Sequence, residues 1–417
     1  MLAKVLGAQI RTEFPIFKNN EKKVNGQILP LVYLDSAVSA QKPQAVINSI
    51  IKHMECDYGS VHRGAYGVSV RSSLQFEDAR QKVANFIGRS VTPNQVIFTK
   101  STTESLNILA NGIAEVYLTE KSRIVTTAIE HHANLIPWQQ AALKKDCEIA
   151  YIPLIGKKTA DLRLNLLEAK KLITKNTKVV SLAYVGNVLG QVNPIAEIIE
   201  LAKQVGALVV LDCAQSMSTH QDDLFALGAD AVVFSPHKIY GPSGIGVLAM
   251  TEQLIEELPP LLFGGGMISS VTLEESTWAS GPSKFEAGTP PITEAIGLAA
   301  AIDWVENCGR ERIFNHSKYL AKMFAEGLLQ IPHIEVFSPL SGQETIIPFR
   351  HSKVHAHDIA TILDLSNVAM RAGHHCAWPL IRYLGVDALV RCSFAAYSDS
   401  DDVERALNAI KKCYNGL

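Results

Sequence analysis

Between about residue 31 and residue 300, short apolar runs alternate with longer amphipathic ones along the chain. Such an alternation is typical of strands that pair in a mainly parallel sheet and of helices that cover its faces. We therefore predict an α/β fold with a mainly parallel sheet flanked by helices for this part of the chain. Five short runs are the candidate strands on which the argument depends: Val96–Thr99, Arg123–Thr127, Val179–Tyr184, Val209–Leu211 and Ala231–Phe234.

The pattern differs on either side of this region. Residues 18–29 are polar and predict an arm or loop, whereas a helical stretch is expected from Ala300 to Gln330. Shorter strand-like pieces follow, such as Thr345–Phe349 and Val368–Met370. We therefore predict three parts: an N-terminal arm at 1–30 that packs with the small domain, a large domain at 31–299 and a smaller α+β domain at 300–417.

Polar side chains able to do chemistry follow each of the five candidate strands. Because ligands of open α/β sheets bind outside the carboxyl ends of the strands, we expect these side chains to line one site. Ser101, Thr102 and Thr103 follow the first strand and precede an apolar helical pattern, so they mark a helix N-terminus that favours a phosphate. Ordinary capping of that helix is the alternative interpretation.

Histidine and asparagine follow the next two strands. His131, in Glu130-His131-His132, could stack on an aromatic ring, and its nitrogen could move protons near neutral pH. The alternatives are a hydrogen-bonded core histidine and a metal-binding pair with His132, although no third ligand stands at a familiar spacing. Asn187 could donate to a phenolate oxygen, but an asparagine between glycines is also a common turn residue.

An aspartate ends the fourth strand and a lysine follows the fifth. Pyridoxal phosphate needs a lysine amine for its Schiff base and an acid to pair with its pyridine nitrogen. Lys238 and Asp212 supply these two groups, and Ser235 and His237 could serve the phosphate. An arginine partner for Asp212 and a surface position for Lys238 are the alternatives. The strand ends taken together favour pyridoxal phosphate as the cofactor.

Composition narrows the class of protein. The 417 residues are 47% hydrophobic and 19% charged with a net charge of -2 and no basic stripe, so nucleic acid is not the expected partner. No apolar run reaches the roughly 18 residues of a membrane helix, and Met1 to Phe17 lacks the apolar core of a secretory signal. Seven widely spaced cysteines without a Cys-x-x-Cys pair favour a reduced, cytoplasmic location.

The motifs that contain these residues resemble the cysteine desulfurases of the class V aminotransferase family, among the fold-type I pyridoxal phosphate enzymes. The resemblance covers nearly the whole chain in order and is strongest to the group of SUF-system desulfurases and selenocysteine lyase-like enzymes. It implies a seven-stranded, mainly parallel sheet in the large domain and a smaller α+β C-terminal domain. The motifs are Tyr33-Leu34-Asp35-Ser36-Ala37, Val61-His62-Arg63-Gly64, Thr102-Thr103-Glu104, Glu130-His131-His132-Ala133-Asn134, Asn187-Val188-Leu189-Gly190, Asp212 to Gln215, His237-Lys238, Phe285-Glu286-Ala287-Gly288-Thr289-Pro290 and Arg371-Ala372-Gly373-His374-His375-Cys376-Ala377.

The resemblance also implies roles for the residues around the cofactor. Lys238 would hold the cofactor and later act as acid and base, Asp212 would pair with the pyridine nitrogen, and His131 would stack on the ring. Gln215 would contact the phenolate oxygen, and Asn187 would help to hold the substrate carboxylate. The phosphate would be held by Thr102, Thr103, Ser235 and His237, with Thr289 reaching in from a second subunit, which implies a homodimer.

In a desulfurase of this group, Cys376 would be the nucleophile. Its thiolate would attack the sulfur of L-cysteine, leaving a persulfide and alanine, and nearby cations such as Arg371 or His375 could lower its pKa. Arg391 would grip the substrate carboxylate with a bidentate fork, and Arg371 and His62 would be further active-site residues. The sulfur would pass to a SUF-type acceptor protein for iron–sulfur cluster assembly. For Cys376 considered alone, a buried structural thiol is the alternative.

Other functions stay open at this point. Selenocysteine lyase or cysteine sulfinate desulfinase activity would use the same site with less need of Cys376. A non-catalytic relative would serve as a binding scaffold without the cofactor. Pro236, Pro291 and Trp378 depart from the usual pattern of the family, and they bear on access to the site and on turnover. A zinc hydrolase would be built on His131, His132, His374 and His375.

Overall fold

The computed structural model describes residues 6–24, 26–62, 64–156, 162–339, 341–342 and 344–412. Arg63 of the second motif and Cys413 lie outside these described residues. Within the described ranges, no helix is both long and apolar enough to cross a membrane.

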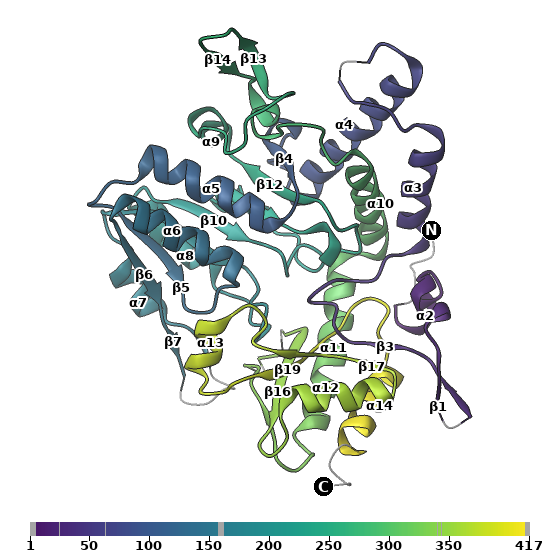
Figure 1. Ribbon diagram of the computed structural model, residues 1–417. Helices are drawn as coiled ribbons and strands as arrows, with labels where there is room; N and C mark the ends of the chain where they lie inside the picture. The colour runs from purple at the N-terminus through teal and green to yellow at the C-terminus, as the bar shows by residue number, and fades with distance from the viewer. Residues whose placement is uncertain are drawn as a thin grey trace.

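A seven-stranded sheet forms the centre of the molecule (Figure 1). All strands run parallel except β12, which is antiparallel to both of its neighbours. The strands are β4 (Val96–Thr99), β12 (Gly246–Met250), β11 (Ala231–Phe234), β10 (Leu208–Asp212), β9 (Thr177–Ala183), β5 (Arg123–Thr127) and β6 (Glu148–Ile152), in this spatial order. The five predicted strands are confirmed as β4, β5, β9, β10 and β11, and their carboxyl ends meet at one edge of the sheet.

Helices cover both faces of this sheet because alternate strand residues point to opposite sides. Val210, Val233 and Leu248 pack under α5 (Thr102–Tyr117) and α6 (Ile136–Lys145). The intervening Val209, Leu211 and Val232 belong to the core on the other face. The helices of that second face are α4 (Gly67–Ile87), α8 (Ile195–Gln204) and α10 (Ile292–Cys308), and α3 (Gln44–Cys56) packs against α10.

A second, smaller sheet lies toward the C-terminus and has its own core. Its four antiparallel strands are, in spatial order, β15 (Ile334–Val336), β16 (Ile346–His351), β19 (Leu389–Ser393) and β18 (Arg371–Gly373). The helices α11 (Arg310–Leu328), α12 (Ala356–Leu365) and α14 (Ser400–Lys412) pack against it. The predicted helical stretch at 300–330 is thus two helices that Gly309 separates, with φ of 85°. The predicted domain boundary falls within α10, and the division into domains stays a prediction.

The N-terminal segment joins the two cores. The polar stretch predicted as an arm or loop includes the antiparallel pair β1 (Lys22–Val24) and β2 (Gln27–Leu29), after α1 (Ala8–Arg11) and α2 (Pro15–Asn19). Arg11 pairs with Asp402 of α14 at 2.8 Å, while Phe14 packs against Trp304 and Tyr397. Next, β3 (Val32–Tyr33) pairs in parallel with β17 (Val368–Ala369). The remaining elements are β7 (Leu154–Ile155), β8 (Arg163–Leu164), α7 (Leu166–Leu172), α9 (Glu252–Glu257), β13 (Ile268–Val271), β14 (Ser276–Trp278) and α13 (Trp378–Tyr383).

Candidate active site

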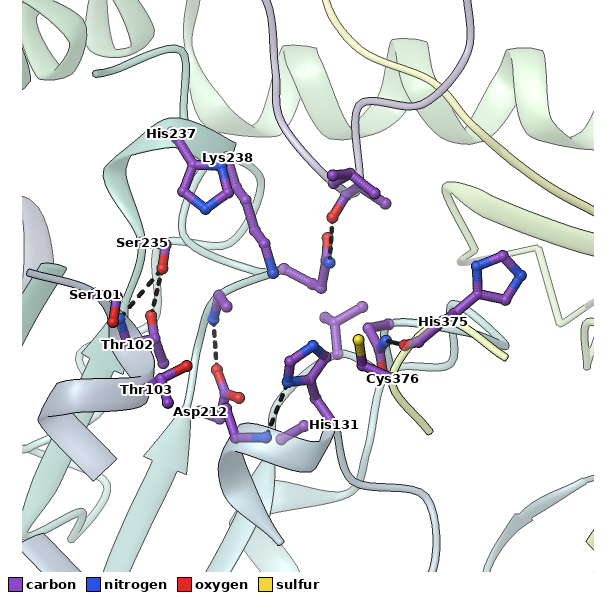
Figure 2. Close-up of a pocket in the computed structure, with 18 of the residues that line it drawn as sticks. Ser101, Thr102, Thr103, His131, Asp212, Ser235, His237, Lys238, His375 and Cys376 are labelled. Carbon is purple, nitrogen blue, oxygen red and sulfur yellow. Dashed lines mark hydrogen bonds between the residues drawn. The ribbon is translucent and has the colours of Figure 1, made fainter. Parts of the chain in front are cut away.

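A cavity of about 280 Å³ opens at the edge of the large sheet where the five predicted strands end (Figure 2). The small sheet and the segment before α13 close its other side. Every residue predicted for the site lines this cavity except His62 and Thr289. The predicted residues in its wall are Thr102, Thr103, His131, Asn187, Asp212, Gln215, Ser235, His237, Lys238, Arg371, Cys376 and Arg391.

Hydroxyl groups at the N-terminus of α5 form one end of the cavity. The Ser101 side chain caps the helix by accepting from the Glu104 N–H at 3.2 Å. Thr102 Oγ1 and Ser235 Oγ lie 2.6 Å apart, so the ends of β4 and β11 are tied together (Figure 2). Burial lowers the pKa of His237 beside them to about 4. Hydroxyls and the free N–H groups of a helix N-terminus suit a phosphate group.

Lys238 and Asp212 face each other across the middle of the cavity. Burial lowers the pKa of the lysine amine, and Asp212 partly opposes that shift. Burial raises the pKa of Asp212, whose Oδ1 accepts from the Ala214 N–H at 2.9 Å. A less basic amine has a larger neutral fraction that can act as a nucleophile. The buried acid is suited to pair with a protonated ring nitrogen.

His131 lies against the cavity at the turn after β5. Its Nδ1 accepts from the Ala133 N–H at 3.0 Å, and burial, followed by the charge of Lys238, lowers its pKa to about 3. The ring is therefore neutral near pH 7, which suits stacking on an aromatic ring better than the proton transfer near neutral pH that we expected from the sequence.

A buried network that the sequence did not indicate fixes this turn. Glu130 accepts from Thr127 Oγ1 and from Asn134 Nδ2, at 2.7 Å for the latter. Asn134 Oδ1 in turn accepts from Ser181 Oγ at 2.6 Å and from the Trp138 indole at 3.1 Å. Burial raises the pKa of Glu130 to about 7. The network holds the backbone that positions His131.

Arginines form the opposite end of the cavity. Arg391, on β19, donates from Nη1 to the Asn187 carbonyl at 2.6 Å, and its Nη2 lies 3.5 Å from Asp35 Oδ1. Arg371 Nε donates to Asp35 Oδ2 at 3.1 Å. Burial lowers the pKa of Arg391 to about 10, so it remains a cation near pH 7. Its Nε and Nη2 are buried without a hydrogen-bond partner among the described residues, and a substrate carboxylate would satisfy both.

Cys376 is an exposed, free thiol on the segment that precedes α13. It interacts electrostatically with Lys238 and with Arg391. Of the two cations suggested from the sequence, His375 is excluded, because burial lowers its pKa to about 3 and leaves its ring neutral. The thiol therefore faces a cavity with a cationic wall, and it is not a buried structural cysteine.

Two amides that we expected to contact the ligand also donate to backbone carbonyls. Asn187 Nδ2 donates to the His375 carbonyl at 2.8 Å, and Gln215 Nε2 donates to the Ala37 carbonyl at 2.7 Å. Both side chains still line the cavity. Their bonds connect the Cys376 segment and the first motif to the large sheet.

His62 and Thr289 lie elsewhere on the surface. His62 is exposed, packs edge-on against Phe76 at 5.8 Å between ring centres and borders a different cavity. Thr289 is exposed in the segment before α10. Neither residue reaches the cavity of its own chain. Among the residues that the structure describes, no group of three or more histidine, cysteine, aspartate or glutamate side chains is placed to hold a metal ion.

The residues of the cavity fit pyridoxal phosphate on the evidence of their own chemistry. The helix N-terminus with its hydroxyls suits the phosphate, buried Lys238 and Asp212 suit the aldehyde and the ring nitrogen, and neutral His131 suits the ring face. The unsatisfied atoms of Arg391 suit the carboxylate of an amino acid bound next to it.

Comparisons with known proteins agree with this chemistry. The model of the class V aminotransferase family matches residues 32–406. A cysteine desulfurase of Haloferax volcanii is 40% identical over 412 residues, covering 96% of this chain and 95% of its own length. The apo structure of a cysteine desulfurase from Thermococcus onnurineus is 33% identical, with a TM-score of 0.92 and complete coverage of both chains. The cysteine desulfurase CsdA of Escherichia coli, solved in an S-sulfonic acid form, is 32% identical with a TM-score of 0.89 over 98% of each chain. The chain therefore belongs to the class V aminotransferase family and, within it, to the pyridoxal phosphate-dependent cysteine desulfurases.

Proposed function

We propose that Cys376 accepts sulfur from L-cysteine as a persulfide and that the enzyme supplies this sulfur for iron–sulfur cluster assembly. The observation that carries the proposal is the position of Cys376, an exposed thiol in the wall of a cavity that also contains Lys238 and Arg391. A desulfurase needs a nucleophilic thiol within reach of the substrate sulfur, and Cys376 is the cysteine in this wall.

The substrate would be oriented by its two charged ends. Arg391 would bind the carboxylate through Nε and Nη2, while its Nη1 stays bonded to the Asn187 carbonyl. Arg371, half exposed at the cavity mouth, would add a second positive charge. Thr102, Thr103, Ser235 and His237 would hold the cofactor phosphate at the opposite end, with Gln215 beside the phenolate oxygen.

Pyridoxal phosphate, when bound, supplies an electron sink for the substrate carbon that loses a proton. Lys238 would be its attachment point and would carry protons to and from the substrate. Cys376 would attack the substrate sulfur as a thiolate, so that a sulfur–sulfur bond forms while the carbon–sulfur bond breaks. The electron pair stays with the carbon, which takes up a proton, and alanine is released.

A homodimer would complete the site. Thr289 and His62 are exposed and lie away from the cavity of their own chain, which agrees with a role in the cavity of a second copy. In that arrangement the Thr289 hydroxyl would contact the phosphate of the partner subunit. The sulfur would then leave Cys376 for a thiol of a SUF-type acceptor protein, which the exposure of Cys376 permits.

Alanine release tests this assignment. Purified enzyme loaded with pyridoxal phosphate is mixed with L-cysteine and a reductant, and alanine is measured for the wild type and for Cys376→Ala. We expect turnover by the wild type and at least a hundredfold loss in the variant, which would match the loss of a nucleophile. Full activity of the variant on L-cysteine would refute the role of Cys376.

The same pair of proteins separates the related activities. Cysteine sulfinate and selenocysteine carry leaving groups that depart without attack by a thiol, so Cys376→Ala is expected to retain turnover on both. A wild type that is active on selenocysteine and inactive on L-cysteine, even with a sulfur acceptor added, would instead make it a selenocysteine lyase. Transfer of labelled sulfur from Cys376 to an acceptor protein checks the proposed pathway.

A further inference from the structure

The segment that carries Cys376 is fastened to the turn that carries His131. The His132 N–H donates to the Cys376 carbonyl at 2.7 Å, and the Trp378 N–H donates to His132 Nε2 at 3.1 Å. His132 therefore bonds to the nucleophile's own carbonyl through its backbone and to the residue two positions further on through its ring. His131 faces the cavity, and the residue that follows it, His132, holds the backbone that carries the Cys376 thiol.

Aromatic packing supports the ring of His132 in this position. The rings of His132 and His374 lie 6.0 Å apart, tilted by 30°, and His374 stacks on Trp378 at 4.7 Å and 23°. His374 Nδ1 also accepts from the Cys376 N–H at 3.2 Å. Arg382 lies over the Trp378 ring at 5.4 Å. The half-exposed Trp378 therefore covers the outer side of a stack that begins at the large sheet.

The backbone at the nucleophile needs such support. His375 and Cys376 both adopt the left-handed conformation, with φ of 53° and 54°. Residues with a side chain rarely adopt this region unless the surrounding contacts hold them there. The contacts that do so here include the His132 bonds, the Cys376–His374 bond, the bond from Asn187 to the His375 carbonyl and the bond between His375 Nε2 and the Leu389 carbonyl.

We propose that His132 is a positioning residue for the nucleophile, and that its ring, by accepting from the Trp378 N–H, keeps the Cys376 thiol directed at the substrate sulfur. The inference rests on the proposed role of Cys376. It assigns no proton transfer to His132, because a lone pair on Nε2 is what the bond to Trp378 requires. It also gives a function to Trp378, a residue that departs from the family pattern.

Two substitutions at His132 distinguish the effect of its hydrogen bond to the Trp378 N–H from the effect of losing its side-chain volume. His132→Ala removes the ring acceptor and the stacking partner of His374. His132→Gln places an amide oxygen near the position of Nε2 and can still accept from the Trp378 N–H. The matched control is His357→Ala, which removes an exposed histidine on α12 that does not line the cavity.

Three measurements are made on the cofactor-loaded enzymes: kcat and KM for L-cysteine, turnover of cysteine sulfinate, and amide hydrogen exchange of the 374–380 peptide. For His132→Ala we expect kcat on L-cysteine to fall by about fivefold or more at an unchanged KM. Exchange in the 374–380 peptide becomes faster, and sulfinate turnover stays within about twofold, because that reaction does not use the thiol. His132→Gln recovers most of the lost turnover and protection, and His357→Ala matches the wild type.

Three outcomes would count against the inference. Wild-type turnover of L-cysteine by His132→Ala would overturn it, because water would then replace the ring without loss. Equal losses on L-cysteine and cysteine sulfinate would also overturn it, since they indicate general damage to the site. Cys376→Ala is assayed beside these variants: if it keeps full activity on L-cysteine, the proposed function fails, and the inference fails with it for that separate reason.

Discussion

Burial is the shared cause behind the protonation states of the active-site residues. It lowers the pKa of Lys238 and of His131 and raises that of Asp212, because the charged form of each group is disfavoured away from water. Burial also lowers the pKa of Arg391, and the negative charge of the neighbouring Asp35 partly opposes that shift. The cavity therefore keeps Arg391, the cation proposed to bind the substrate, in its charged form, while its lysine and histidine lean toward their neutral forms. A cofactor that reacts with a neutral amine and stacks on a neutral ring needs this combination.

Glu130 gives a prediction about stability, because its pKa rises from an ordinary 4.5 to about 7 in the folded protein. A raised carboxyl pKa means that the folded state binds the proton more tightly than the unfolded state. The stabilisation is therefore complete below about pH 4.5 and is lost as the pH rises through about 7. Glutamine resembles the protonated acid and does not titrate. The free energy of unfolding of Glu130→Gln, relative to that of the wild type, should therefore rise by about 2–3 kcal/mol from pH 5 to pH 8.

Urea denaturation of the holoenzyme at the two pH values measures this difference. Glu404→Gln, at an exposed position of α14, is the control and should follow the pH dependence of the wild type. A Glu130→Gln variant that is less stable than the wild type at both pH values would show that Glu130 is ionised in the folded protein.

Among the elements, the junction of β4, α5 and β12 forms the end of the cavity suited to phosphate. Gly246 begins β12 and lies against the turn between β4 and α5. A Cβ at this position would stand 2.3 Å from the Ser101 carbonyl carbon, 2.6 Å from its Cα and 2.6 Å from Thr99 Oγ1. Two of these three atoms belong to the backbone and cannot rotate away, so the turn that carries Ser101 and Thr102 would have to move.

Gly246→Ala should therefore weaken cofactor binding. We expect the dissociation constant of pyridoxal phosphate to rise by at least about tenfold, with a loss of stability of about 1–3 kcal/mol from overpacking. A titration of the apo protein followed by cofactor absorbance measures the first effect. Gly67→Ala is the matched control, since its Cβ would meet only the flexible end of Arg71 at 3.3 Å. Unchanged affinity in Gly246→Ala would contradict the assignment of the phosphate to this junction.

The elements also show what the sequence can and cannot predict. Buried parallel strands are short apolar runs, so β4, β5 and β11 were predicted with their bounds. Because the carboxyl ends of parallel strands meet at one edge of the sheet, the sequence also predicted that Thr102, His131 and Lys238 lie close together. Nothing in the run Gly246–Met250 distinguishes an antiparallel strand from a parallel one, and the place of β12 between β4 and β11 was not predicted. The contacts of Asp35 with Arg391 and of His132 with Trp378 join residues that are hundreds of positions apart. Such pairs depend on how the two sheets meet, which no local pattern encodes.

For the whole molecule, the cavity lies where the two sheets meet. The large sheet contributes Lys238, Asp212 and His131, and the C-terminal part contributes Arg371, Cys376 and Arg391. Chemistry on the cofactor and capture of sulfur are thus assigned to different parts of one chain. In the proposed dimer, the exposed Thr289 would extend this division to a second chain, since it is the residue predicted to hold phosphate that its own cavity does not contain.

A mixing experiment tests whether Thr289 acts across a dimer. Lys238→Ala removes the cofactor attachment from its own cavity, and Thr289→Asp places a negative charge against the phosphate of the partner's cavity, so each variant alone should be inactive. In a heterodimer of the two, the cavity of the Thr289→Asp chain keeps its own Lys238 and receives Thr289 of the partner subunit, so it is intact. Random exchange of subunits should therefore restore about a quarter of the wild-type alanine release. Mixing Lys238→Ala with Cys376→Ala is the control and should restore none, because both residues line the cavity of their own chain. If Thr289→Asp is fully active alone, or if the first mixture stays inactive although subunits exchange, Thr289 does not complete the site of a partner.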